Sequence, residues 1–289
     1  MQALAYYLAY PFIRLMGILP FSVLFFFSDM FAIIIRLAGY RKQVIKTNLR
    51  KSFPEKHGDE INRLTRSYYH YMCDLTLETF KMMWMPESEI RRRVRVLNPE
   101  VAERLYNQKR SIIVALGHYG NWEWYACSFQ LCAPHQLVII YHPLTNPYFE
   151  RLMQRQRTRF EMEITSMQQS VRTMLANRNR LTATAFVGDQ AAPVNSYWMT
   201  FLNQDSSVYT GIEKMSKKLD CPVVYIHPTR PQRGFYTMEL EVLVEDPSTT
   251  RQNEITELYT RRLEKDIREN PVIWLWSHKR WKIQRPQTT

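Results

Sequence analysis

The sequence has few cysteines, with only Cys73, Cys127, Cys132 and Cys221 in 289 residues. No two of them form a Cys-x-x-Cys pair, and no cysteine and histidine spacing typical of a zinc site is present. The four thiols are therefore predicted to be reduced core residues of a protein that faces the cytosol. No metal site is expected, and no redox cofactor.

Acidic residues are also scarce relative to basic ones, because 39 Lys and Arg oppose 27 Asp and Glu and leave a net charge of +12. Such an excess indicates an anionic partner. The zinc-finger spacing, RNA-binding aromatic signature and basic zipper that would favour nucleic acid are missing. We therefore predict no nucleic-acid partner and expect an anionic membrane surface or a phosphorylated lipid instead.

A clean run of about 20 apolar residues is missing as well. Residues 3–40 are the most hydrophobic part of the chain, but they are interrupted by Pro11, Arg14, Gly17, Pro20, Asp29 and Arg36. They also lack the leading positive charge and the cleavage site of a secretory signal. Residues 1–40 are predicted to be a hydrophobic membrane anchor, either one imperfect transmembrane helix or two short interfacial helices. A buried helical hairpin of a soluble protein is the alternative.

A basic cluster follows this segment directly, formed by Arg41, Lys42, Lys46, Arg50 and Lys51. Positive charge next to an anchor favours the cytoplasmic side of the membrane. We therefore predict that residues 41–289 form one catalytic domain on the cytoplasmic side of a membrane.

From residue 94 onward, strand and helix patterns alternate along the chain. Strands are expected at residues 94–97, 111–116, 137–141, 181–187, 222–226 and 235–244, and helices near 99–107, after 121, from 146, at 212–219 and at 253–268. This alternation predicts an α/β fold with a mainly parallel, mixed sheet flanked by helices. The regular alternation of residues 235–244 favours an antiparallel edge strand.

His118 and Glu123 lie five residues apart in a run that contains Gly117 and Gly120. On one helix their side chains would point roughly 140° apart, so the run must cross from a strand into a helix. His118 then lies in the connecting loop, at the carboxyl end of a strand, where open α/β sheets bind ligands. Glu123 can turn back and hold the imidazole, as in a general base.

Two further candidate groups follow from the same pattern. Asp189 and Gln190 come directly after the strand at 181–187. They are expected near His118 on the rim of the sheet, the edge where the parallel strands have their carboxyl ends. In the helix from residue 146, Arg157 borders the apolar face, whereas Arg151, Arg155 and Arg159 lie opposite and are expected in solvent. An ordinary turn at Asp189 and a structural ion pair at Arg157 are the alternatives.

The end of the chain, residues 274–282, mixes tryptophans with histidine, lysine and arginine. Such a mixture suits the headgroup region of a membrane, and it also suits stacking on single-stranded nucleic acid. The hydrophobic start of the chain favours the membrane.

The His118 and Glu123 pair matches the His-x4-Asp/Glu motif of membrane acyltransferases, and the chain resembles the bacterial lipid A biosynthesis (late) acyltransferase family. Supporting stretches are Asn48, Leu49, Phe53 and Pro54, then Gly188, Asp189 and Gln190, then Trp274, Trp276, His278, Arg280 and Trp281. The segment 201–211 departs from the family pattern, because Asn203 stands where a glycine is usual.

The resemblance implies a bacterial inner-membrane enzyme that moves a fatty acyl chain from an acyl carrier protein or coenzyme A thioester to a hydroxyl of a lipid A-type glycolipid. His118 would be the general base with Glu123 in support, and Arg157, Asp189 and Gln190 would bind substrate, with no cofactor. Open alternatives are a lysophospholipid or other membrane-lipid acceptor, or a non-catalytic protein that binds anionic lipid or nucleic acid.

Overall fold

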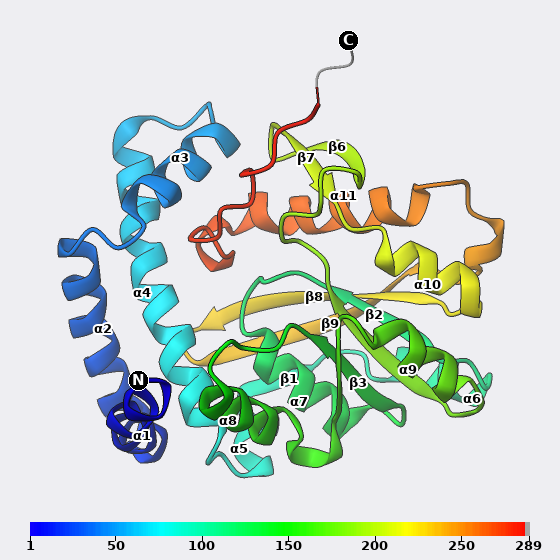
Figure 1. Cartoon of the computed structure of the whole chain (residues 1–289), viewed down its shortest axis with the longest axis horizontal. Helices are drawn as coiled ribbons and strands as arrows, with labels where there is room; N and C mark the ends of the chain where they lie inside the picture. Colours follow the sequence, from blue (N-terminus) through cyan, green and yellow to red (C-terminus); the bar gives the residue numbers. More distant parts are fainter. Residues whose placement is uncertain (287–289) are drawn as a thin grey trace.

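The structure is a computed structural model of the chain, and it describes residues 1–286. The predicted α/β architecture is confirmed, since a mostly parallel sheet is covered by helices (Figure 1). Residues 287–289, at the end of the predicted domain 41–289, lie outside the described residues.

The helices are α1 Gln2–Ile18, α2 Phe21–Leu37, α3 Lys42–Ser52, α4 Gly58–Met82, α5 Glu87–Arg93, α6 Glu100–Asn107, α7 Trp122–Cys132, α8 Pro147–Arg157, α9 Ser170–Ala176, α10 Gly211–Leu219 and α11 Glu254–Glu269. The strands are β1 Val94–Val96, β2 Ile112–Leu116, β3 Gln136–Tyr141, β4 Glu163–Ser166, β5 Thr182–Val187, β6 Tyr197–Phe201, β7 Gln204–Val208, β8 Val223–Gln232 and β9 Phe235–Val244.

The main sheet has seven strands in the order β1-β9-β8-β2-β5-β3-β4. Strands β8, β2, β5, β3 and β4 run parallel to one another, whereas β9 runs antiparallel to β8. β2 is the middle strand of the seven, and all five of its residues are buried. The carboxyl ends of β2 and β5 therefore lie side by side, as required for the two predicted strand-end motifs to meet.

The prediction for residues 235–244 is half right. β9 is antiparallel to β8, but it is not an edge strand, because β1 pairs with it on its other side. The sequence analysis also missed β4 and the separate hairpin of β6 and β7. That hairpin turns at Leu202 and Asn203, both with positive φ. Asparagine tolerates this left-handed conformation better than most residues, so Asn203 can stand where the family usually has glycine.

Side chains of β2 point alternately to the two faces of the sheet, and each face has its own core. Ile113 and Ala115 pack in the cluster that includes residues of α4, α10 and α11. Ile112, Val114 and Leu116 pack in the cluster that includes residues of α5, α6 and α7. Burial on both faces explains the continuous apolar run of this strand.

The hydrophobic N-terminal segment forms two helices, α1 and α2, which both pack against the long helix α4. Pro20 stands at the break between them and directly precedes α2. In residues 1–286 no single helix has the length and apolar composition of a membrane span; only the pair α2 and α3 qualifies together, with a 91° bend between them.

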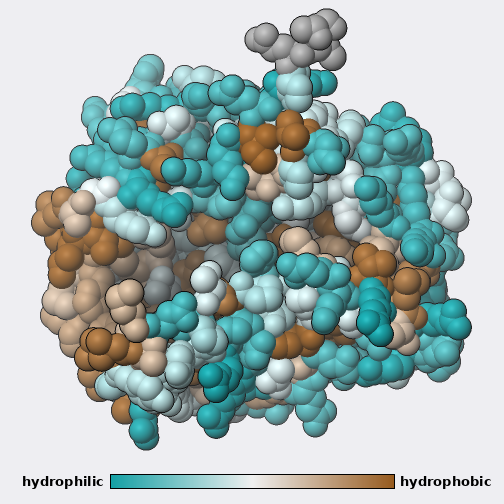
Figure 2. Space-filling model, in the orientation of Figure 1, coloured by the Kyte–Doolittle hydropathy of each residue, from teal (hydrophilic) through white to brown (hydrophobic). Residues whose placement is uncertain are grey.

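Most of the large hydrophobic side chains exposed in the described residues nevertheless lie in the first 40 residues. Leu8 is 72% exposed in α1, and Phe26 and Leu37 are 67% and 77% exposed in α2. Figure 2 shows an apolar patch at the left of the molecule, where Figure 1 places α1 and α2. A contiguous apolar surface of this kind is typical of a membrane or protein contact.

Candidate active site

The strand-to-helix junction at the His118 motif is confirmed. β2 ends at Leu116, and α7 begins at Trp122. The side chain of Asn121 caps α7, because its Oδ1 accepts a hydrogen bond of 3.1 Å from the Trp124 amide. Its Nδ2 donates to the buried carboxylate of Glu78 at 2.8 Å. The loop that bears His118 is thus held at its downstream end by a cap that is itself anchored to α4.

His118 and Asp189 are brought together by the pairing of β2 with β5. Leu116 lies opposite Val187 in the parallel register, so the residues after the two strands meet at the same rim. The Asp189 carboxylate contacts His118 twice: Oδ1 lies 2.6 Å from the ring Nδ1, and Oδ2 accepts the His118 amide at 2.9 Å. A carboxylate on Nδ1 favours the tautomer that carries its proton there.

Asp189 is itself buried and held from a third direction. The indole Nε1 of Trp274 donates to its Oδ2 at 2.7 Å. Burial alone would raise the pKa of the Asp189 carboxyl, but the charge of His118 and the hydrogen bonds from His118 and Trp274 together lower the pKa below its usual value. Asp189 therefore stays ionised at neutral pH and faces the imidazole as an anion.

The other ring nitrogen of His118 faces Gln190. The Gln190 Nε2 lies 3.3 Å from the His118 Nε2, a long contact that a substrate group can replace. The edge of the Trp122 ring packs against the imidazole, with centroids 4.9 Å apart. The His118 side chain retains 18% exposure, against 2% for Asp189. Its Nε2 is thus the ring nitrogen that has no carboxylate partner.

Glu123 does not hold His118, which differs from the prediction. In the described residues its carboxylate bonds only to Arg157, with Oε1 at 2.5 Å from Nη2 and Oε2 at 3.2 Å from Nε. The reason is geometric: the Nδ1 of His118 is already bound by Asp189, and the first turn of α7 directs Glu123 toward α8. Arg157 points inward as predicted, and its partner is the motif carboxylate itself.

The chain is similar to known proteins over nearly its whole length. A family model described as bacterial lipid A biosynthesis acyltransferase matches residues 1–283. The chain belongs to this family. The lipid A biosynthesis palmitoleoyltransferase of Escherichia coli (strain K12) and the lipid A biosynthesis acyltransferase of Shigella flexneri are each 22% identical to it over 274 residues, which cover 92% of this chain and 87% of each relative. The predicted resemblance is confirmed, and the protein is an acyltransferase.

Part of the segment 274–282 of this acyltransferase is buried, so the prediction that it lies at a membrane surface is wrong in part. Trp274, Trp276 and Arg280 are 2%, 0% and 3% exposed. Trp274 holds Asp189, and Arg280 donates to the Ser207 carbonyl at 2.8 Å. The segment packs under the His118 rim because its indole nitrogens find partners inside the protein, which a membrane interface cannot provide in a fixed geometry.

The prediction of a solvent-exposed side chain is wrong for one of the three arginines. Arg151 and Arg155 are exposed as predicted, but α8 ends at Arg157 and Arg159 lies beyond it. Phe160 has a φ of 57°, which turns the chain out of the helix. Arg159 then points inward and donates to the carbonyls of Met82 and Met85. Helical spacing fails for Arg159 because the helix has already ended.

Several residues that surround His118 are not predicted by the sequence. The sequence pattern favours a membrane contact for Trp274, and it gives no sign of the contacts that Trp122 and Glu78 make. His278 also lies close by: its Nε2 faces the Ala191 amide at 3.5 Å, and burial lowers the pKa of its imidazole to about 4. The one sequence signal for these residues is that some of them belong to the family motifs. The order of those motifs along the chain does not show that their side chains are in contact.

No group of three or more histidine, cysteine, aspartate or glutamate side chains within residues 1–286 has the arrangement of a metal site. All four cysteines are free thiols, and Cys132 alone of them is partly exposed. The arrangement at the rim is instead that of an imidazole oriented by a carboxylate, which suits proton transfer.

Gly120 gives a prediction about stability. Its φ is +67°, and a Cβ at this position would overlap the Tyr125 hydroxyl. Gly120→Ala is therefore expected to lower the free energy of unfolding by about 2 to 5 kcal/mol, from left-handed strain and overpacking. Denaturant unfolding measures this loss. Gly39→Ala is the matched control, because Gly39 has a φ of +72° and open space around it. Equal losses in the two variants would contradict the overlap.

Proposed function

We propose that this acyltransferase moves a fatty acyl chain from an acyl thioester to a hydroxyl of a lipid A-type glycolipid, with His118 as general base. The observation that supports the proposal most strongly is the Asp189 contact on Nδ1, which leaves Nε2 of this partly exposed ring as a proton acceptor. In this reaction Nε2 takes the hydroxyl proton while the oxygen attacks the thioester carbonyl.

The carbonyl oxygen becomes an anion in the tetrahedral intermediate, and the C–S bond then breaks. The proton on Nε2 passes to the departing thiolate, so an ester and a free thiol result and the enzyme is regenerated. Asp189 stabilises the imidazolium that exists between these two proton transfers. The amide of Gln190, which faces Nε2 in the free protein, is suited to donate to the substrate oxygen instead.

Glu123 and Arg157 have a supporting role in this proposal. Their ion pair fixes the Arg157 guanidinium beside the motif, with Nη1 outside the pair. Burial alone would lower the pKa of Arg157, but the Glu123 charge raises it. We propose that the permanently charged guanidinium binds a phosphate of the acceptor or of the acyl carrier. Glu123 then contributes to catalysis by positioning Arg157.

Membrane association is the second half of the proposal. The exposed apolar side chains of α1 and α2 and the net charge of +12 support attachment of residues 1–40 to an anionic bilayer. α1 also packs against α8, which bears Arg157. The lipid acceptor would thus reach the rim from the membrane, on the cytoplasmic side of the bacterial inner membrane, where acyl carrier protein and acyl coenzyme A are available.

The test is transfer by the purified protein in neutral detergent. A lipid A-type acceptor is supplied with acyl carrier protein thioesters or acyl coenzyme A of several chain lengths, and products are read by mass spectrometry. We expect the acceptor to gain the mass of one acyl chain, with one donor class preferred. Transfer to a lysophospholipid but not to the glycolipid would contradict the proposed acceptor.

A further inference from the structure

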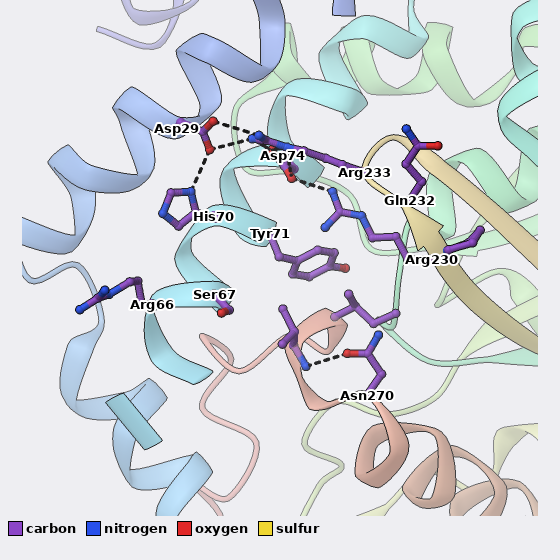
Figure 3. A pocket seen from close by; sticks show the side chains of 13 residues that line it. Asp29, Arg66, Ser67, His70, Tyr71, Asp74, Arg230, Gln232, Arg233 and Asn270 are labelled. Atoms are coloured by element: carbon purple, nitrogen blue, oxygen red, sulfur yellow. Dashed lines mark hydrogen bonds and ion pairs between the residues drawn. The ribbon is translucent and has the colours of Figure 1, made fainter. Parts of the chain in front are cut away.

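Two cavities adjoin the middle of α4, away from the residues that surround His118. The larger has a volume of about 550 Å³ and is shown in Figure 3; the smaller has a volume of about 380 Å³. Arg66 lies on the wall of both. The two cavities differ in charge, because carboxylates line the larger one and none lines the smaller one.

In the larger cavity Arg230 and Arg233 are already neutralised. Arg230 contacts the Asp74 carboxylate at 2.6 Å, and Arg233 contacts both Asp74 and Asp29, at 2.6 and 2.9 Å (Figure 3). The Nδ1 of His70 also bonds to the Asp29 Oδ1 that Arg233 contacts. These contacts join α2 and α4 to the end of β8 and the turn after it. Apart from the arginine that both cavities share, the charges of this cavity therefore serve the fold and leave little attraction for a ligand.

The smaller cavity is lined by four cations and no carboxylate. The lining residues are Arg36, Leu37, Lys42, Lys46, Asn62, Thr65, Arg66 and Tyr69. None of the four cations forms a salt bridge to any described residue, and the closest polar contact is from Lys46 Nζ to Asn62 Oδ1 at 2.7 Å. Four like charges around one hollow repel one another, and a bound anion would remove that repulsion.

The helix termini around this cavity also favour an anion. Lys42 opens α3, whose first turn contains no acidic residue and whose N-cap, Arg41, makes no capping hydrogen bond. A cation at a helix N-terminus is unfavourable, because the first amides already present positive charge there. An anion in the cavity would be attracted both by this terminus and by the side chains around it.

The surroundings of the cavity indicate which anion it binds. Arg36 lies in the last turn of α2, and its neighbours Ile33, Ile34 and Leu37 are 45%, 52% and 77% exposed. The cationic cavity and the exposed apolar surface of α2 are thus adjacent. A soluble phosphate or an acidic protein surface would match only the pocket. A membrane phospholipid matches both, because its phosphate and its acyl chains are joined.

We propose that the cavity formed by Arg36, Lys42, Lys46 and Arg66, named here the α2–α4 basic pocket, binds the headgroup phosphate of an anionic phospholipid. The acyl chains of that lipid lie along the exposed side of α2. This inference rests on the membrane association proposed above and adds a defined lipid site outside the catalytic rim. The bound lipid fixes the depth and orientation of the N-terminal helices at the bilayer surface.

The test compares Lys42→Gln/Lys46→Gln with Arg172→Gln/Arg178→Gln. Both pairs remove two positive charges, but Arg172 and Arg178 are exposed and unpaired among the described residues, on and just after α9. Binding is measured by cosedimentation with phosphatidylcholine vesicles, with and without phosphatidylglycerol. We expect the pocket variant to bind phosphatidylglycerol vesicles about 30-fold more weakly than the parent, from two basic residues near an anionic surface. The α9 variant should bind as the parent does.

Equal losses in both variants, or no loss in either, would overturn the proposal. It would also be overturned if the pocket variant bound vesicles normally but showed a raised KM for an acyl carrier protein thioester, because the pocket would then serve a protein. Thermal unfolding of the pocket variant should be unchanged or occur at a higher temperature, since like charges are removed.

The lipid site and the catalytic proposal can fail separately. His118→Ala should bind phosphatidylglycerol vesicles as the parent does, because His118 lies outside the pocket lining. If the parent binds these vesicles through the pocket but transfers no acyl chain, the lipid site stands and the proposed reaction is wrong. If it transfers acyl chains in detergent but shows no pocket-dependent binding, the lipid site alone is wrong.

Discussion

His118→Ala is expected to lower the rate of acyl transfer by about 10²- to 10⁴-fold, the range typical of losing a general base. The alanine removes a partly exposed imidazole whose Nδ1 is bound by Asp189 and whose Nε2 is the proposed base. The thioester and the acceptor can still bind, so the loss should appear in kcat more than in KM. Steady-state kinetics with mass-spectrometric detection of the product measures both.

The control for this variant is His57→Ala. His57 is an exposed histidine that precedes α4, far along the chain from the rim residues. It should retain parental activity, which shows that losing an imidazole is harmless elsewhere. Circular dichroism of both variants should match the parent. Near-normal transfer by a folded His118→Ala protein would rule out His118 as the base.

Asp189→Asn is expected to lower kcat by about 10³- to 10⁴-fold, although His118 remains in place. Asp189 accepts hydrogen bonds from Nδ1, from the His118 amide and from Trp274. An asparagine that turns its amide nitrogen toward Nδ1 favours the tautomer with the proton on Nε2, and Nε2 then cannot act as the base. It also removes the negative charge that stabilises the imidazolium. Kinetics and ¹⁵N NMR of the imidazole measure the two consequences.

A change of tautomer from Nδ1–H to Nε2–H in the NMR spectrum distinguishes a positioning role from a merely structural one. A large loss of activity with an unchanged tautomer would mean that Asp189 acts in another way. Trp274→Phe removes one hydrogen bond to Asp189 but leaves its charge. We expect that variant to retain the tautomer and to lose far less activity.

The variant Glu123→Gln tests which carboxylate, Glu123 or Asp189, supports His118. The structure predicts that it loosens Arg157 and acts chiefly on KM for the phosphorylated substrate, because Glu123 bonds to Arg157. If Glu123→Gln instead abolishes transfer and Asp189→Asn is nearly normal, the sequence-based assignment of Glu123 as the support of His118 is right. The geometric assignment to Asp189 would then be wrong.

Much of the fold was predictable because its elements have local signals. The buried strand at residues 112–116 and the cap of Asn121 are properties of neighbouring residues, and both agree with the structure. The short strand β4 and the β6–β7 hairpin lack such signals. The hairpin turns through Leu202 and Asn203 without any glycine, so nothing in the pattern marked it. The pairing of β1 with the outer side of β9 was also unpredictable, because a strand of three residues is too short to indicate its partner.

The family, the strand-to-helix junction at His118 and the excess of positive charge follow from the sequence alone, because these depend on residue identity and on short spacings. Which carboxylate reaches the imidazole depends on long-range packing. The spacing of His118 and Glu123 excludes a common helix face but does not create a contact. Asp189 lies 71 residues away and becomes the partner because β2 and β5 pair in parallel and end together. The same long-range packing places Trp274 beneath Asp189 rather than at a membrane, since a buried carboxylate needs donors that the local chain does not supply.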